Sequence, residues 1–264
     1  MKKMLLSVAA AAAMLGSAVF ADPVVIGAGK EGRGYDKWAK DIAAAFSQRG
    51  QEAVVQNFAG SDEITLSICS DKVTFGPAQK DAAYQRAMEG CELMELWTYP
   101  SEEYIFLMVP PDSNIDELED LTSSSKIATD AAGSGSDFTL RQLRRIELGE
   151  EGNKSDWANA AIENRSLKSA MGLGAGGKLD AVFFVGSRGS DDVKFFLKNG
   201  WEPVEVYDKD LNDLAFNGKP LYEGDDIIVP DYGKVYTYRV DTFIYGKELA
   251  GNQQELFESV MATR

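Results

Sequence analysis

The sequence predicts an α/β protein with two lobes, in which each lobe is a mostly parallel sheet flanked by helices. Short apolar runs alternate with amphipathic segments in the first third of the chain, and the same order begins again near residue 126. Both units carry a Gly-rich loop before a helix. The length of 264 residues exceeds one domain of common size. We therefore expect a ligand cleft between two lobes.

The first residues have the composition of a secretory signal peptide. Lys2 and Lys3 give a positive start, Met4–Gly16 is an almost unbroken apolar run, and small residues lead to Ala21. The run is too short and too rich in alanine for a membrane anchor. We expect cleavage after Ala21, which would leave 243 of the 264 residues in the periplasm.

Charge and the absence of histidine narrow the function. The chain has 42 acidic and 27 basic residues, and loss of the leader would change the formal net charge from −15 to −17. A negative field repels nucleic acid and anionic membranes, so neither is an expected partner. A chain without histidine excludes Ser-His-Asp and Cys-His catalysis and His-ligated zinc. We expect a binding protein, not an enzyme, with no metal and no cofactor.

The first lobe is predicted to begin with a strand, a Gly-rich loop and a helix. The strand is Val24–Ile26, the loop is Gly27–Gly32, and apolar residues at helical spacing indicate a helix over Tyr35–Gln48. The order of strands and helices implies parallel pairing. The elements expected next are strands Ala53–Val55 and Val73–Phe75, a helix Asp62–Cys69 capped by Ser61, a helix Gln79–Met88, and strands Leu93–Tyr99 and Tyr104–Val109.

The second unit repeats this order. Its expected elements are strand Lys126–Ala128, loop Gly133–Ser136, helices Asp137–Leu148 and Ser166–Leu173, strand Leu179–Val185, helix Asp191–Asn199 and strand Val204–Val206. After Asp208, an extended run Tyr236–Tyr245 and a closing helix Asn252–Met261 are expected to return to the first lobe. The predicted lobes are therefore 22–105 with 208–264, and 106–207.

Cys69 and Cys91 are the only cysteines. In an exported chain such a pair is more often bridged than free. If the first three strands lie in the order 2-1-3, right-handed crossovers place the second and third helices on one face of the sheet. Cys69 ends one helix and Cys91 follows the other, so we predict a disulfide between them.

The Gly-rich loops suggest an anion site. Gly27–Gly32 matches the dinucleotide fingerprint, but Val54–Asn57 lacks the acidic residue that would hold a ribose hydroxyl. A Gly-rich loop at a helix start still presents backbone N–H groups to carboxylate or phosphate. Gly133–Ser136 adds two hydroxyls at the matching place in the second unit. Either two anion cradles face each other across a cleft, or both loops are ordinary caps and turns.

Several segments together resemble the TAXI family of solute receptors, which serve TRAP transporters. The most specific is Phe75–Tyr84, in which Gln, Asp and Tyr recur at the family's spacing. The others are Ile26–Gly29, Gly32–Tyr35, Ala59–Glu63, Gly133–Ser136 and Asp180–Gly186. The resemblance implies a type II periplasmic binding protein fold. It also implies a monomeric receptor that captures a small organic anion, glutamate or a related carboxylate, for the membrane subunits of a TRAP-type transporter.

A second resemblance is to the phosphate-binding proteins of ABC importers. It rests on Gly27–Gly29, Lys37–Ala39 and the Gly-Ser-Gly-Ser loop. Those proteins place an Arg shortly before that loop, whereas Ala128–Ala132 contains none. Phosphate is therefore the alternative ligand. An exported enzyme that uses Lys or carboxylates is a third, more distant alternative.

The ligand residues implied by these patterns come from both lobes. Arg33 would neutralise an acidic ligand, and Tyr35 and Phe184 would form apolar walls; a solvated Arg33 and core positions for the two rings are the alternatives. The lobes would close by a hinge through Tyr104–Val109 and the Asp208 region. The full predicted set is Gly29, Arg33, Tyr35, Ser61, Gln79, Ser134, Ser136 and Phe184.

Overall fold

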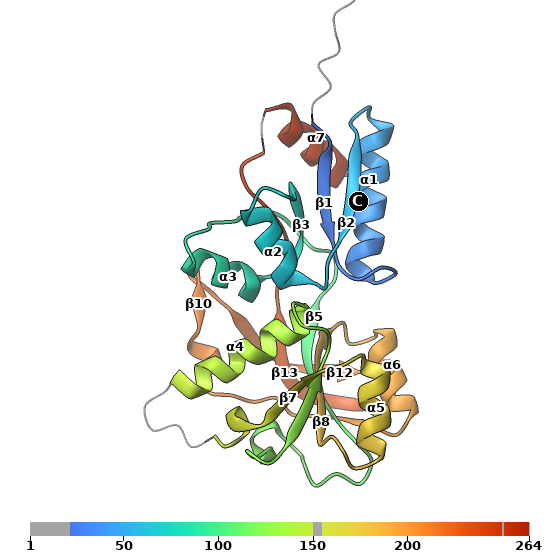
Figure 1. Cartoon of the computed structure of the whole chain (residues 1–264), viewed down its shortest axis with the longest axis vertical. Helices are drawn as coiled ribbons and strands as arrows, with labels where there is room; N and C mark the ends of the chain where they lie inside the picture. The colour runs from blue at the N-terminus through green and yellow to red at the C-terminus, as the bar shows by residue number, and fades with distance from the viewer. Residues whose placement is uncertain (1–21, 150–154, 250, 264) are drawn as a thin grey trace, which may run out of the picture.

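The computed structural model describes residues 22–149, 155–249 and 251–263. It consists of two lobes arranged along the long axis of the molecule (Figure 1). The predicted signal peptide, Met1–Ala21, lies outside the described residues. Among the helices that are described, none combines the length and the apolar character needed to cross a bilayer.

Lobe 1 is a five-stranded sheet in the order β2-β1-β3-β14-β4, in which β14 is antiparallel to both of its neighbours. Its strands are β1 Val24–Ala28, β2 Ala53–Asn57, β3 Phe75–Gln79, β4 Met94–Thr98 and β14 Thr242–Gly246. Its helices are α1 Gly34–Gln48, α2 Ser61–Cys69, α3 Lys80–Met88 and α7 Asn252–Met261. The Phe75 ring lies 5.8 Å from Phe46 of α1 and 5.0 Å from Phe257 of α7, so strand β3 and both helices share one core.

The Cys69–Cys91 disulfide is confirmed, with 6.0 Å between the two Cα atoms. The first three strands do lie in the order β2-β1-β3. Helices α2 and α3 pack together, so the carboxyl ends of the two helices come close enough for the bridge. The topological argument from the sequence therefore holds.

Lobe 2 repeats the strand order of lobe 1. The order β7-β6-β8-β5-β9 corresponds to β2-β1-β3-β14-β4, with the antiparallel strand in the same place. The strands are β5 Glu103–Val109, β6 Lys126–Thr129, β7 Ala161–Asn164, β8 Ala181–Gly186, β9 Glu202–Val204, β12 Tyr222–Val229 and β13 Gly233–Val240, with a small pair β10 Ala215–Phe216 and β11 Lys219–Pro220. The helices are α4 Gly135–Gly149, α5 Leu167–Ala175 and α6 Asp191–Lys198, with short turns at Leu118–Asp120, Trp157–Asn159 and Asp210–Asp213.

The chain returns to lobe 1 later than the expected boundary at residue 208. Strands β12 and β13 form a hairpin that pairs with β5, and Tyr222 and Tyr238 are buried in the lobe 2 core. Asp241 divides the predicted run Tyr236–Tyr245, so that β13 belongs to lobe 2 and β14 to lobe 1. The hinge also differs from expectation, because Tyr104–Val109 and Asp208 lie within lobe 2. The two crossovers are at 99–102 and at Asp241.

The lobes also touch through buried polar contacts of α3. Asp81 is fully buried and accepts hydrogen bonds from Thr139 of α4 at 2.6 Å and from Tyr222 of β12 at 3.0 Å. The Lys80 Nζ donates to the Pro220 carbonyl at 2.6 Å. Burial raises the pKa of Asp81 to about 6, although the two hydroxyl donors act in the opposite direction.

Candidate ligand-binding site

A cavity of about 250 Å³ lies between the lobes where several helices begin. Its wall includes residues at the starts of α1, α2, α4 and α6, namely Gly34, Ser61, Gly135 and Asp192. The first N–H groups of a helix lack partners within the helix, and the helix dipole adds partial positive charge there. Four helix starts from two lobes therefore favour a negatively charged group in this cavity.

The structure brings together all but one of the predicted site residues. The residues that line the cavity are Gly29, Arg33, Tyr35, Ser61, Gln79, Ser134 and Ser136. Phe184 lies instead in the core of lobe 2, where it stacks between Phe106 and Phe196 at 5.4 and 5.6 Å. Because side chains alternate along a strand, Val185 is the β8 residue that faces the cavity.

A buried carboxylate braces the first Gly-rich loop. Asp36 accepts hydrogen bonds from the Gly32 N–H at 2.7 Å, from Lys40 at 2.8 Å and from Asn57 at 2.8 Å. The same Asn57 amide donates to the Gly29 carbonyl at 2.7 Å, which ties the end of β2 to the loop. The Asn57 and Lys40 bonds hold the pKa of Asp36 at about 2, well below its usual range.

Lobe 2 carries the same brace at the same spacing. Asp137 accepts from the Gly133 N–H at 3.3 Å, from Arg141 at 2.8 Å and from Asn164 at 2.7 Å. The Asn164 amide also donates to the Asp130 carbonyl at 2.7 Å. Gly133 has φ +78°, as Gly32 has +79° in lobe 1, and neither conformation suits a side chain. The duplicated glycine, aspartate and asparagine positions show that both loops are held in one geometry.

Three serine hydroxyls at the cavity are fixed by accepting backbone hydrogen bonds. Ser61 accepts from the Gln79 N–H at 3.2 Å, Ser134 from the Asp137 N–H at 3.2 Å, and Ser136 from the Val185 N–H at 3.0 Å. A hydroxyl that accepts in this way keeps its own proton to donate.

The expected capping role of Ser61 is wrong. Gly60 is the N-cap of α2, and no side chain makes a capping hydrogen bond there. The Glu63 carboxylate accepts from the Ala59 N–H at 2.7 Å, just before the helix. The Ser61 side chain is thus turned toward β3 and the cavity instead of back along its own helix.

The two cations of the cavity are both paired across the cleft. The Lys30 Nζ lies 2.5 Å from Asp130, and the Arg33 guanidinium lies 2.5 Å from Asp192. The basic partner belongs to lobe 1 and the acidic partner to lobe 2 in each pair. Arg33 therefore reaches the cavity as predicted, but in this closed arrangement a carboxylate of the protein holds it.

The lobes are in direct backbone contact beside the cavity. A Cβ atom placed on Gly60 would lie 2.8 Å from the Gly135 nitrogen, and one placed on Gly135 would lie 2.0 Å from the Gln79 Oε1. Neither position has room for a side chain. The two glycines allow the helix starts of α2 and α4 to approach each other.

Glu103 is a site residue that the sequence reasoning missed. It lies at the start of β5 by the crossover, and its Oε2 accepts hydrogen bonds from Tyr35 at 2.7 Å and from Thr242 at 2.8 Å. Burial raises the pKa of Glu103, while the hydrogen bonds from Tyr35, Thr242 and Gln79 lower it. The available signal was an acidic residue directly before the apolar run Tyr104–Val109. Lys30, Asp130 and Asp192 were also missed.

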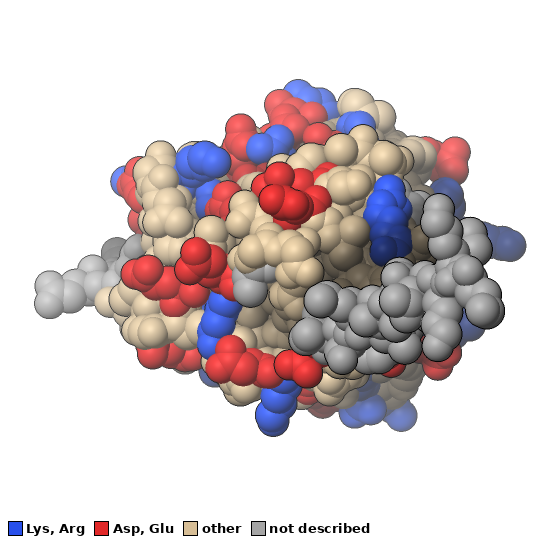
Figure 2. Space-filling view, turned by 90° about the horizontal axis from the view of Figure 1, so that it is seen from above, with Lys and Arg blue, Asp and Glu red and all other residues tan. Residues whose placement is uncertain are grey.

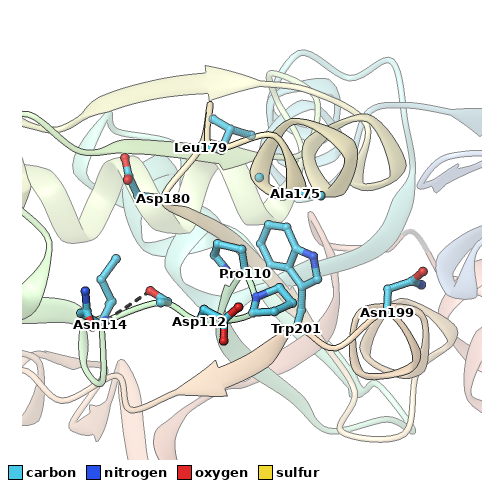
Figure 3. A pocket seen from close by; sticks show the side chains of 13 residues that line it. Pro110, Asp112, Asn114, Ala175, Leu179, Asp180, Asn199 and Trp201 are labelled. Carbon is cyan, nitrogen blue, oxygen red and sulfur yellow. Dashed lines mark hydrogen bonds between the residues drawn. The ribbon is translucent and has the colours of Figure 1, made fainter.

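A second, larger cavity of about 640 Å³ lies at the far end of lobe 2 (Figure 3). Pro110, Asp112, Asp180 and Trp201 are among its lining residues, and none of the predicted site residues is. Strand β8 begins near this cavity and ends at Gly186 in the cleft, so about 20 Å separates the two. This cavity is not part of the site between the lobes.

Charged side chains of both signs are interspersed on the face at the lobe 1 end of the molecule. Figure 2, which looks onto the lobe 1 end, shows acidic and basic side chains next to one another over the visible face. The excess of negative charge is therefore not concentrated in one patch there. Recognition of a ligand in the cleft must depend on local groups.

No protein-family model matches the chain, and no curated protein proves similar to it in sequence. Solved structures resemble it in fold. XAC2383 from Xanthomonas citri, bound to ATP, has a TM-score of 0.57 at 11% identity over 92% of this chain and 83% of that chain. A putative L-cystine ABC transporter from Listeria monocytogenes has a TM-score of 0.52 at 15% identity over 91% and 89%. The periplasmic aliphatic sulphonate binding protein SsuA from Escherichia coli has a TM-score of 0.50 at 15% identity over 91% and 70%. The chain therefore has the two-lobed α/β fold of type II periplasmic solute-binding proteins.

Proposed function

We propose that this protein is a periplasmic solute receptor, exported by the signal peptide Met1–Ala21. It captures a small organic anion, glutamate or a related carboxylate, and passes it as a monomer to the membrane subunits of a TRAP-type transporter. The observation that carries the proposal is the convergence of four helix starts from both lobes on one cavity.

The donors are distributed so that one ligand would hold both lobes. Ser61 at the start of α2 belongs to lobe 1, and Ser136 at the start of α4 belongs to lobe 2. A carboxylate between them would accept hydrogen bonds from each side and would therefore favour the closed arrangement. The volume of about 250 Å³ is below the range of drug-sized pockets, which indicates a small solute.

The alternative is a phosphate receptor of an ABC importer. Phosphate would use the same hydroxyl and N–H donors, and similar structures include the substrate binding protein of an amino acid ABC transporter. No arginine of the cavity is available without breaking the Arg33–Asp192 pair, however. Genes for TRAP-type membrane subunits beside the gene of this protein would support the first proposal, and an adjacent ABC ATPase gene would support the alternative.

Thermal unfolding with a ligand panel tests the proposal. A ligand that binds only the native state at 100 times its Kd adds about 2.7 kcal/mol of stability and raises Tm. We expect a carboxylate such as glutamate to do so, and Ser136→Ala to reduce its effect. Ser124→Ala, on the exposed surface of the same lobe, is the matched control. Stabilisation by orthophosphate alone would favour the ABC alternative, and no stabilisation by any small anion would contradict both.

A further inference from the structure

The floor of the cavity holds an amide oxygen that has no donor. Gln79 is 2% exposed, and its Oε1 has no hydrogen-bond partner among the described residues. The same oxygen points at the start of α4, since a Cβ on Gly135 would lie 2.0 Å from it. Leaving a buried acceptor unpaired is costly, so this oxygen favours a donor from outside the chain.

Glu103 adds a carboxyl group beside that oxygen. Gln79 and Glu103 both line the cavity, and the Gln79 amide lies near enough to lower the pKa of the Glu103 carboxyl. Lys30 and Arg33 are each paired with an aspartate, whereas Glu103 takes part in none of the ion pairs found in the described part of the chain. The cavity thus has three carboxylates against two cations. Because burial disfavours the charged form of Glu103, a positive group nearby would stabilise its carboxylate.

These acceptors conflict with a ligand that is only an anion. Phosphate or a simple dicarboxylate would bring negative charge to the helix starts, but it would offer no N–H group to Gln79 and would repel Glu103. A ligand with a negative and a positive end satisfies both parts of the cavity. We propose that the solute is a zwitterion whose carboxylate lies at the helix starts and whose protonated nitrogen donates to Gln79 and Glu103.

The proposal rests on the proposed function and narrows its ligand class to amino acids and related ammonium carboxylates. It excludes two kinds of close analogue. A 2-hydroxy acid lacks the positive charge, and a fully methylated betaine has the charge but no N–H group to donate. Tyr35 and Thr242 hold the Glu103 carboxyl in place and would act as positioning residues.

Calorimetric titration with matched pairs of solutes tests the proposal on the wild-type chain. The twenty amino acids are compared with their 2-hydroxy analogues, including glutamate with 2-hydroxyglutarate and alanine with lactate. We expect the bound amino acid to prefer the site by about 30-fold or more over its analogue, as for a hydrogen bond to a charged group. An analogue or a plain dicarboxylate that binds as tightly as the amino acid would overturn the zwitterion proposal and leave the proposed function intact. Failure of every carboxylate in both series would overturn the proposed function and this inference together.

Glu103→Gln separates recognition from structure. It keeps an acceptor oxygen but removes the negative charge, so the preference for the amino acid should fall about 10-fold while the affinity for the hydroxy analogue stays the same or improves. A structural defect would weaken both ligands alike. Glu102→Gln, an exposed neighbour that hydrogen bonds to Tyr104, is the matched control and should keep the preference. An unchanged preference in Glu103→Gln would refute the role of this carboxyl.

Discussion

At the cleft, one set of residues offers hydrogen-bond donors to the cavity, and another set fixes the loops that carry those donors. The hydroxyls and N–H groups that face the cavity carry no unusual chemistry, but their positions depend on the two aspartate braces. Asp36 and Asp137 each fix a glycine of the loop four residues before them, and an asparagine from the neighbouring strand completes each brace. Preorganised loops of this kind lower the entropic cost of binding.

Gly135→Ala should prevent tight closure of the lobes. The added Cβ would lie 2.0 Å from the Gln79 Oε1 and close to Gly60, so either the glutamine moves or the lobes part. We expect the Kd for the bound solute to rise at least 10-fold with less than about 1 kcal/mol change in unfolding free energy, since parting of the lobes makes room for the methyl group and alanine favours the helix over glycine. Gly149→Ala, at the other end of the same helix with no atom near its Cβ, is the control. Unchanged affinity in Gly135→Ala would contradict the closed geometry.

Phe184 and Glu103 show what the sequence could not reveal about single residues. Strand β8 is a continuous apolar run, so its sequence does not mark the face that looks toward the cleft. That face depends on which strands flank β8, and those pairings are not local. Glu103 was hidden for the same reason, because its partner Thr242 is 139 positions away. By contrast, Ser61, Gln79, Ser134 and Ser136 lie at the end of a strand or at the start of a helix, so local patterns sufficed to place them.

At the scale of elements, the order of strands and helices along the chain was predictable, but the lobe to which a late strand belongs was not. The alternation of strands and helices predicted both β-α-β units, and the disulfide followed on the condition of a 2-1-3 strand order, which the structure has. The lobe 1 sheet also receives one antiparallel strand, β14, from the part of the chain that follows lobe 2. The uninterrupted β propensity of Tyr236–Tyr245 concealed the change of lobe at Asp241. Only the tertiary pairing separates β13 from β14.

The Cys69–Cys91 bridge should contribute substantially to the stability of lobe 1. It closes a segment with a sequence separation of 22, for which chain entropy predicts about 3 kcal/mol. Replacement of both cysteines by alanine should lower the urea midpoint of lobe 1, and added reductant should have no further effect on that variant. A double variant as stable as the oxidised wild type would show that the bridge makes no net contribution to the stability of lobe 1.

At the scale of the whole molecule, the lobes are joined by more than the two crossovers. Helix α3 of lobe 1 packs against α4 of lobe 2, and the buried polar groups of Asp81, Thr139 and Tyr222 lie between them. The cleft side is different, because there the lobes meet through partly exposed ion pairs. We expect opening to occur at the ion pairs and not at α3.

Asp81 should make stability fall as pH rises. Its folded pKa of about 6 is above the ordinary 3.8, so the folded state binds the proton more tightly than the unfolded chain does. The stabilisation is fully present below about pH 4 and is lost as pH rises through about 6, a difference of about 3 kcal/mol. Asp81→Asn should remove this part of the pH dependence in urea unfolding between pH 4 and 7. If the wild type and the variant had parallel profiles, Asp81 would not be the group that titrates.

The ion pairs Lys30–Asp130 and Arg33–Asp192 should stabilise the closed arrangement without solute. All four side chains are partly exposed, from 21% to 51%, and such pairs contribute about 0–1 kcal/mol each, so together they shift the balance between closed and open molecules by up to about 30-fold. We expect the double variant Asp130→Asn with Asp192→Asn to have a larger radius of gyration than the wild type in small-angle X-ray scattering of the solute-free protein. Salt near 1 M, where the screening length is about 3 Å, should expand the wild type in the same direction and leave the variant unchanged.

Asp226→Asn removes the exposed pair with Lys234 within the β12–β13 hairpin and should not alter the scattering. Equal radii for the wild type and the double variant at low salt would mean that backbone contact at Gly60 and Gly135, and not charge, holds the cleft shut.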